Sequence, residues 1–275
     1  MPRGLVRGAL TAAAGVAALV VGPAGVPPAQ ASPPSTTAGQ SPVTSPLRHV
    51  LESRVLGKSV RGRAITAWHL DNRPIGKRKG PTVVLIATMH GNEGAPRQIL
   101  QSLRAARVIH GLDLWVVPVY NPDGLAAHSR RNAHGVDLNR NYPYHWADLD
   151  GSYESGPRPG SEPETRAMMR FLGGLRPDYV LSFHQPLHGV DTDNKRPAFS
   201  RRVAHHLGLP ATTLDCGGVC HGTMTGWFNR HFKGFALTVE YGARPPRRLM
   251  TTTAPRQVLA IFGAYAGAAA RGSQS

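Results

Sequence analysis

The segment TVVLIATMHGNEGAPRQILQSL, residues 82–103, decides how this chain folds. Its first half is an apolar run rich in β-branched residues, which is typical of a strand buried on both faces. Its second half repeats apolar residues at helical spacing, with Ile99, Leu100 and Leu103 on one face. A buried strand followed by an amphipathic helix predicts an α/β fold with a largely parallel sheet.

The same alternation of strands and helices continues along the chain. Apolar runs predict buried strands at 112–119, 178–183 and 235–239, and a polar-alternating run predicts an edge hairpin strand at 64–70. Helical patterns lie at 161–172, where Ser161 and Glu164 form a candidate capping box, at 202–207 and at 255–269. Because no repeat or break in composition divides the rest, we expect a single domain over residues 48–275.

The N-terminal residues have the pattern of an export signal. Residues 1–31 combine two arginines, a short apolar stretch and the small-residue sequence AQA, which predicts cleavage after Ala31. An uncleaved membrane anchor is the alternative for such a segment. Residues 32–47 are rich in Pro, Ser and Thr and predict a flexible tether. We therefore expect a secreted or cell-wall-associated protein with no stable membrane span once the signal is cleaved.

The chain is strongly basic, with a formal net charge of +16. Such a charge attracts polyanions. The basic residues are scattered and no nucleic-acid-binding motif occurs, so we expect no nucleic-acid partner. For an exported protein, an anionic cell wall or membrane surface is the expected partner, and simple solubility is the alternative.

The chain has two cysteines, Cys216 and Cys220, in the sequence DCGGVC. In an oxidising compartment, two cysteines around a Gly-Gly turn predict a local disulfide. The alternative is a metal site that also uses His221, but that site would still need a fourth ligand.

Polar residues follow the predicted core strands. The four strands run into His90, Asn121, His184 and Glu240. In open α/β sheets, ligands bind beyond the carboxyl ends of the strands. We therefore expect the sheet to bring these residues to one edge.

The sequence HGNE after the first core strand predicts a metal site. A catalytic zinc ion takes three protein ligands and leaves one position for water. His90 and Glu93 can reach one ion if the chain turns immediately after the strand, which Gly91 and Gly94 permit. His184 is the candidate third ligand, although a strand-end histidine on its own is more often structural. The sequence therefore predicts one zinc ion at this edge.

Other residues supply candidate acid–base and binding groups. Glu240 follows a wholly apolar strand, where partial burial would raise its pKa and suit a general base; an ion pair with a nearby arginine is the alternative. Arg140 beside Asn139 can hold a substrate carboxylate, and Arg130 can polarise the scissile carbonyl. Asp137 can orient a ligating histidine. Read alone, this stretch is also consistent with a solvated basic loop.

Several motifs together carry a family resemblance. HGNE, NPDG, RRNAHGVDLNRNYP, PGSEPET, SFHQPL and TVEYG occur in the order found in zinc metallocarboxypeptidases of the funnelin type. The chain resembles in particular the bacterial branch of murein peptide amidases and γ-D-glutamyl-diaminopimelate carboxypeptidases. The resemblance spans residues 57–240. It implies a single α/β domain whose mixed, largely parallel sheet has about eight strands flanked by helices.

The resemblance also implies roles for individual residues. His90, Glu93 and His184 would hold zinc, and Glu240 would be the general base. The matching positions make Arg130 the carbonyl-polarising residue, and make Asn139 and Arg140 the ligands of a terminal carboxylate.

Two features depart from the family pattern. Digestive members carry a mobile tyrosine in the loop that here reads DCGGVC, and no tyrosine lies there. The specificity position falls near Thr225, which is neither acidic nor large and apolar. Selectivity for basic or aromatic C-terminal residues is therefore not expected.

The leading functional hypothesis is a secreted zinc peptidase that hydrolyses an amide next to a free carboxylate. The basic charge and the resemblance favour a peptidoglycan peptide with a γ-D-Glu-diaminopimelate bond. A general metallocarboxypeptidase or an N-acyl amino acid deacylase is the alternative. A non-catalytic wall-binding protein on a retired enzyme scaffold is a third hypothesis.

Overall fold

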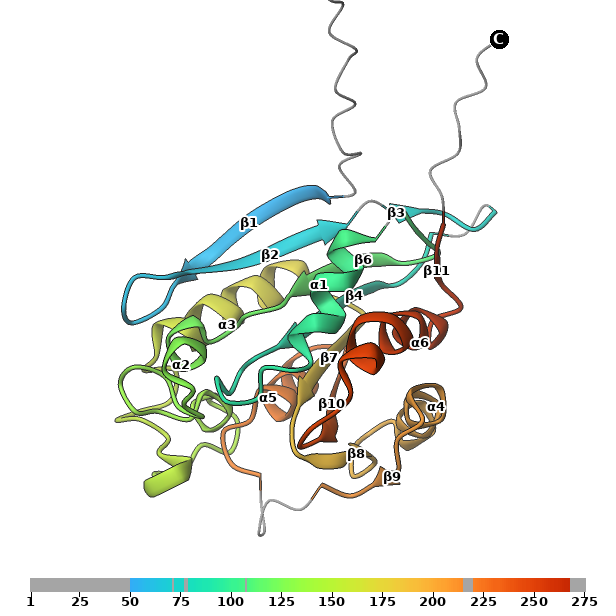
Figure 1. Cartoon of the computed structure of the whole chain (residues 1–275). Helices are drawn as coiled ribbons and strands as arrows, with labels where there is room; N and C mark the ends of the chain where they lie inside the picture. The colour runs from blue at the N-terminus through green and yellow to red at the C-terminus, as the bar shows by residue number, and fades with distance from the viewer. Residues whose placement is uncertain (1–49, 71, 77–78, 107, 215–219, 268–275) are drawn as a thin grey trace, which may run out of the picture. The chain divides into compact units, whose positions relative to one another are not determined.

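An eight-stranded sheet forms the centre of the protein, in a computed structural model that describes residues 50–267 apart from 71, 77–78, 107 and 215–219 (Figure 1). In spatial order its strands are β1 (Val50–Lys58), β2 (Ala64–Leu70), β6 (Asp113–Val117), β4 (Thr82–Ala87), β7 (Tyr179–His184), β10 (Phe235–Gly242), β8 (Leu187–Asp191) and β9 (Ala211–Thr212). Strands β6, β4, β7 and β10 run parallel to one another. The carboxyl ends of these four strands therefore meet at one edge.

Antiparallel pairs extend the parallel centre on both sides. The β1–β2 hairpin pairs through β2 with β6, and β8 pairs with β10. A second, three-stranded sheet contains β3 (Asn72–Arg73), β5 (Ile109–His110) and β11 (Tyr265–Ala266). The mixed, largely parallel sheet agrees with the fold class expected from the sequence.

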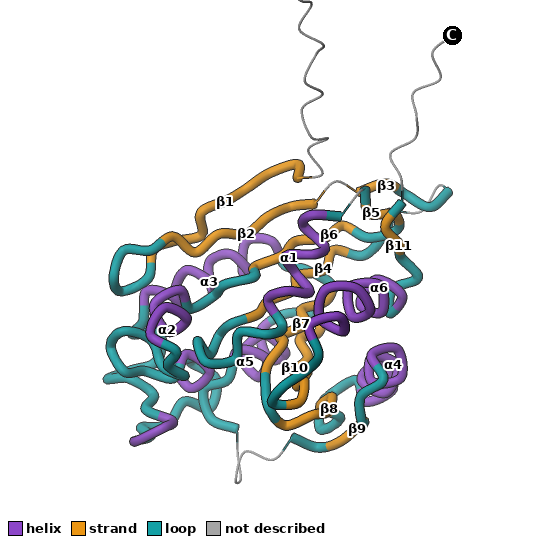
Figure 2. Tube along the Cα trace, viewed as in Figure 1, coloured by secondary structure: helices purple, strands orange, loops and turns teal. Residues whose placement is uncertain are grey.

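Helices and turns connect the strands (Figure 2). The α-helices are α1 (Arg97–Ala105), α2 (Pro122–Ala127), α3 (Pro163–Leu175), α4 (Pro197–Leu207), α5 (Met224–His231) and α6 (Ala254–Ala260). The shorter helical turns are η1 (Leu138–Arg140), η2 (Gly151–Tyr153) and the π-type turn η3 (Leu249–Thr253).

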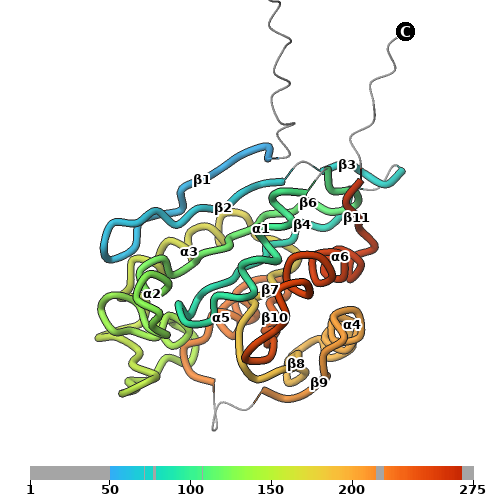
Figure 3. The backbone as a smooth tube through the Cα atoms, viewed as in Figure 1, coloured from blue at the N-terminus to red at the C-terminus, as the bar shows by residue number. Residues whose placement is uncertain are grey.

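The core consists of two apolar layers, one on each face of the sheet. Along β4, Val83 and Leu85 belong to the layer that includes residues of α1, α4 and α6. Val84 and Ile86 point to the opposite layer, which includes residues of α3 and α5. Because both faces of β4 are covered, its sequence is a continuous apolar run rather than an alternating one. Figure 3 traces the backbone from the N-terminus to the C-terminus through the strands and helices that contribute to these layers.

Most of the expected elements are confirmed. The predicted strand at 64–70 is β2, and the four predicted core strands correspond to β4, β6, β7 and β10 within a few residues at each end. The expected helix after Pro96 is α1, whose Ile99, Leu100 and Leu103 are buried. The pattern at 202–207 is the second half of the longer helix α4.

Two expectations about helices are wrong. The capping box at α3 does not form, because Ser161 bonds to Asn141 and Glu162 while the Glu164 carboxylate accepts the Val60 N–H. The helix predicted over 255–269 ends at Ala260. Gly263 has a φ of +67°, a left-handed conformation that stops the helix.

The N-terminal expectations fall outside the described residues. The signal at 1–31 and the tether at 32–47 therefore remain predictions. Within the part of the chain that the structure describes, no helix has the length and apolar character needed to cross a membrane.

Candidate active site

The turn after β4 brings His90 and Glu93 to the carboxyl edge of the sheet. Thr88 has a φ of 58°, so the chain leaves the strand direction at once, and the Glu93 N–H donates to the His90 carbonyl at 3.1 Å. Gly91 is required at this turn, because a Cβ there would lie 1.9 Å from the carbonyl carbon of Gly124. The glycine thus permits a close approach of two loops that a larger residue would prevent.

His184 and Glu240 reach the same edge from neighbouring strands. They are register partners in the parallel pair formed by β7 and β10. The adjacent pair of β4 and β7 aligns Ala87 with Phe183, so the turn that follows β4 starts level with the end of β7. Three segments that are far apart in the sequence therefore converge.

The ligating atoms of His90, Glu93 and His184 face a common point. His90 Nδ1 lies 2.7 Å from Glu93 Oε1, and His184 Nδ1 lies 3.0 Å from Glu93 Oε2. The two Nδ1 atoms are 3.2 Å apart. Two ligand atoms about 2.0–2.1 Å from a tetrahedral zinc ion are separated by about 3.3 Å. The three buried side chains therefore fit one zinc ion and leave its fourth position open.

A second set of contacts orients these side chains. Asp137 Oδ1 lies 3.0 Å from His90 Nε2, and Ser182 Oγ lies 2.9 Å from His184 Nε2. Each histidine thus turns its Nδ1 toward the common point, an arrangement typical of metal sites. Gln185 was not singled out from the sequence, and its backbone N–H donates to Glu93 Oε2 at 3.2 Å.

The carboxyl groups next to the histidines have lowered pKa values. Burial alone would raise the pKa of Glu93, but hydrogen bonds with His184 and His90 outweigh it and hold the pKa well below its usual range. Burial likewise opposes ionisation of Asp137, yet His90 and Arg130 keep its pKa low. An ionised Glu93 is the form that binds a cation.

Glu240 lies beside this group in a different environment. It is buried, and burial raises its pKa above the ordinary value for glutamate. Among the described residues, no lysine or arginine forms an ion pair with Glu240, so the expected alternative of a structural ion pair is not observed. A carboxylate with a raised pKa is suited to accept and return a proton.

The loop that contains Asp137 also positions two arginines. Arg130 donates to Asp137 Oδ2 through Nε at 3.0 Å and Nη2 at 2.8 Å, which leaves Nη1 3.3 Å from His90 Nδ1. Arg140 is buried in the turn η1 and donates from Nη1 to the Asn139 carbonyl at 2.8 Å. The Asn139 side chain is fixed by the Met224 N–H, which donates to its Oδ1 at 3.1 Å.

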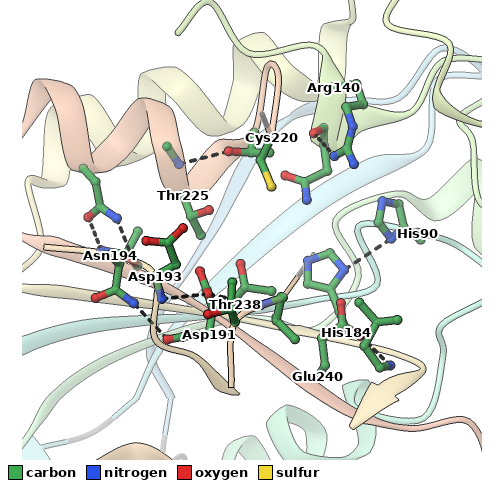
Figure 4. A pocket seen from close by; sticks show the side chains of 18 of the residues that line it. His90, Arg140, His184, Asp191, Asp193, Asn194, Cys220, Thr225, Thr238 and Glu240 are labelled. Atoms are coloured by element: carbon green, nitrogen blue, oxygen red, sulfur yellow. Dashed lines mark hydrogen bonds between the residues drawn. The ribbon is translucent and has the colours of Figure 1, made fainter. Parts of the chain in front are cut away.

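A cavity of about 830 Å³ collects these groups at the sheet edge (Figure 4). Its lining includes the predicted residues His90, Arg130, Asn139, Arg140, His184, Thr225 and Glu240. Glu93 does not line the cavity. Asn121 lies at the same edge, as expected, because its N–H donates to the Thr88 carbonyl at 2.9 Å and its Nδ2 donates to the Met89 carbonyl at 3.2 Å. It does not line the cavity, and its Oδ1 caps α2 by accepting the Gly124 N–H at 2.8 Å.

Six charged or aromatic residues of the cavity were not singled out from the sequence. They are Tyr144, Tyr153, Asp191, Asp193, Lys195 and Arg230. Figure 4 shows Asp191 and Asp193 on the side of the cavity away from His90. No local pattern marks these residues, because they come from a strand end, loops and helices that only the tertiary fold brings together.

The cysteine pair is only partly described. Cys220 lines the cavity, whereas Cys216 lies outside the described residues. The disulfide and the alternative metal site with His221 both remain predictions.

Comparison with known proteins places this geometry in context. A family model described as zinc carboxypeptidase matches residues 48–187. Murein peptide amidase A of Escherichia coli (strain K12) is 33% identical over 152 residues, which cover 47% of this chain and 59% of the relative. The catalytic chain of carboxypeptidase N from Mus musculus is 30% identical over 197 residues, covering 58% of this chain and 42% of that one. This chain thus covers less than two thirds of either relative.

Solved structures share the fold. The crystal structure of a murein-tripeptide amidase from Escherichia coli O157 superposes with a TM-score of 0.58 at 25% identity, covering 76% of this chain and 90% of that chain. Bovine thrombin-activatable fibrinolysis inhibitor in complex with a tick inhibitor gives a TM-score of 0.63 at 18% identity, covering 78% and 88% of the two chains. The second likeness shows the fold alone.

Proposed function

Because this chain belongs to the zinc carboxypeptidase family, we propose that it hydrolyses a C-terminal amide next to a free carboxylate, in a peptide derived from peptidoglycan. The observation that carries this proposal is the cavity itself. His90 and His184 of the ligand cluster line it, together with the candidate base Glu240 and the arginine pair Arg130 and Arg140. The expected family and enzyme class are confirmed by the match.

The proton chemistry is assigned to Glu240. A zinc ion held by the three ligands would lower the pKa of a water molecule to about 7 and polarise the scissile carbonyl. The water oxygen forms a bond to the carbonyl carbon, and Glu240 accepts the proton that the water loses. Glu240 then gives this proton to the nitrogen as the C–N bond breaks, so that an amine and a carboxylate leave.

The arginines are assigned to charge stabilisation and substrate placement. Arg130 keeps its Nε and Nη2 bound to Asp137. Its Nη1 donates to Glu93 Oε1 at 3.4 Å in this structure, and in the complex with substrate it would donate to the carbonyl oxygen as negative charge develops. Arg140 and Asn139 would bind the substrate carboxylate, because a guanidinium matches a carboxylate with two parallel hydrogen bonds. The carboxylate contact restricts cleavage to the last amide of the substrate.

For the substrate, we infer a γ-D-Glu-diaminopimelate bond. The similarity to murein peptide amidase A supports this inference. The polarity of the cavity supports it as well, because Asp193 and Arg230 both line it and carry opposite charges. The diaminopimelate side chain ends in an ammonium and a carboxylate, so a wall with both charge signs is complementary to it. Asp191 Oδ1 accepts the Asp193 N–H at 3.1 Å, which fixes the backbone of this wall.

A substrate panel with an Asp193→Asn variant tests the substrate assignment. We expect the protein to release diaminopimelate from murein tripeptide, measured by mass spectrometry, and a chelator to stop the release. Loss of a hydrogen bond to a charged group costs about 1.5–3 kcal/mol, so Asp193→Asn should lower kcat/KM for this substrate about tenfold or more. The same tripeptide ending in alanine lacks the side-chain ammonium and should respond little to the substitution.

The controls separate the alternative functions. Asp148→Asn changes an exposed aspartate that does not line the cavity and should match the wild type. Trimming of ordinary peptides without release of diaminopimelate would identify a general carboxypeptidase. Cleavage of N-acyl amino acids alone would identify a deacylase.

We further propose that residues 1–31 export the protein and that its positive charge holds it at an anionic wall. After expression in a secreting host, N-terminal sequencing of the exported protein should give Ser32 as the first residue. An intact N-terminus on membrane-associated protein would instead support the anchor alternative.

A further inference from the structure

We propose that Tyr153 is a positioning residue for substrate, because its ring holds the guanidinium groups of Arg130 and Arg140 in place beside the cavity. This inference rests on the proposed role of the two arginines. The Cζ atoms of Arg130 and Arg140 lie 5.4 and 4.9 Å from the centroid of the Tyr153 ring. A guanidinium at this distance is attracted by the negative face of the ring. One aromatic side chain thus contacts both groups that would bind the carbonyl and carboxylate of the substrate.

The two arginines differ in how much they need this contact. Arg130 is already fixed by two hydrogen bonds to Asp137. Within the described chain, the Arg140 guanidinium makes one hydrogen bond, from Nη1 to the Asn139 carbonyl. The remaining N–H groups of Arg140 are therefore available for a ligand. The Tyr153 ring restrains the Arg140 guanidinium, because a single hydrogen bond does not hold it in one orientation.

The position of Tyr153 is set by a turn that is tied to the arginine loop at two points. On one side, Arg131 Nη1 donates to the Gly151 carbonyl at 2.9 Å, and on the other, the Asp137 N–H donates to the Glu154 carbonyl at 2.7 Å. Gly151 has a φ of 64°, which lets the turn reverse sharply. These two hydrogen bonds therefore hold the turn that carries Tyr153 against the loop that carries Arg130 and Arg140.

Core packing does not explain this tyrosine. Its side chain is 49% exposed, and no aromatic ring of the described residues stacks on it. Its aromatic contacts in the described chain are the two cation–π contacts.

Kinetics of Tyr153 variants test this role. Each cation–π contact at an exposed site contributes a few-fold in affinity, so Tyr153→Ala should raise KM for murein tripeptide roughly 3- to 10-fold. The value of kcat should stay within about twofold, because Glu240 is unchanged and the two hydrogen bonds to Asp137 keep Arg130 in place without the ring. Tyr153→Leu fills the space without the ring and should behave like the alanine variant, whereas Tyr153→Phe keeps the ring and should match the wild type.

Matched measurements keep the result interpretable. Tyr265→Ala removes a similarly exposed tyrosine that stacks on His110 and should leave KM unchanged. Nitrogen-15 relaxation of the Arg140 Nε–H group should show greater mobility in Tyr153→Ala, and this readout does not depend on any substrate. If the wild type cleaves no peptide, the proposed function fails while the relaxation data still test the stacking. Unchanged KM and unchanged relaxation in Tyr153→Ala would overturn the proposal, as would a phenylalanine variant as impaired as the alanine variant.

Discussion

Glu240→Gln should lower kcat by about 10²- to 10⁴-fold, the usual contribution of a general base or acid. Glutamine keeps the shape of the side chain but can neither accept nor return the proton. Glu240 donates no ligand atom to the cluster of His90, Glu93 and His184, so zinc content should remain one ion per chain. Steady-state kinetics and elemental analysis of the same preparation check both statements.

The matched control for this variant is Glu52→Gln. Glu52 is exposed on β1 and its carboxylate bonds only to the nearby Arg54 among the described residues, so its substitution should leave kcat unchanged.

The kinetics of Glu240→Gln also decide whether the protein is an enzyme or a wall-binding protein on the same scaffold. A binding protein would show the same weak or absent turnover with and without the Glu240 carboxylate and would bind wall fragments equally well.

His184→Ala should abolish stable zinc binding. The variant loses one of the three zinc ligands. Loss of a residue that only hydrogen-bonds to a ligand already lowers metal affinity about 10- to 100-fold, so we expect zinc affinity to fall more than about 100-fold. Zinc should raise the melting temperature of the wild type, because an ion that binds only the folded state stabilises it. The variant should show no such increase when it is titrated with zinc and followed by calorimetry.

His205→Ala provides the comparison for the metal experiment. His205 is exposed near the end of α4 and belongs to no group of metal-ligating residues in the described chain. It should retain one zinc ion per chain and the zinc-dependent increase in melting temperature. Retention of tight zinc binding by His184→Ala would contradict the assignment of His184 as a ligand.

Local sequence patterns were sufficient where a side chain's role depends on its own strand or turn. The apolar runs that became β4, β6, β7 and β10 were recognisable because both faces of these strands are buried. Patterns failed where a tertiary contact competed with a local one. Glu164 matches a capping box in sequence, but its carboxylate accepts a hydrogen bond from Val60, more than a hundred residues away.

The family, the α/β class and the candidate groups could be recognised from residue type, order and spacing. HGNE at the end of an apolar strand is one such pattern. The contacts between distant segments became visible only in the folded chain. The fold places Tyr153 against Arg130 and Arg140, and it brings Asp193 and Arg230 into the lining of one cavity. Such contacts leave no periodicity in the chain, because their distances are set by how the loops pack at the carboxyl edge of the sheet.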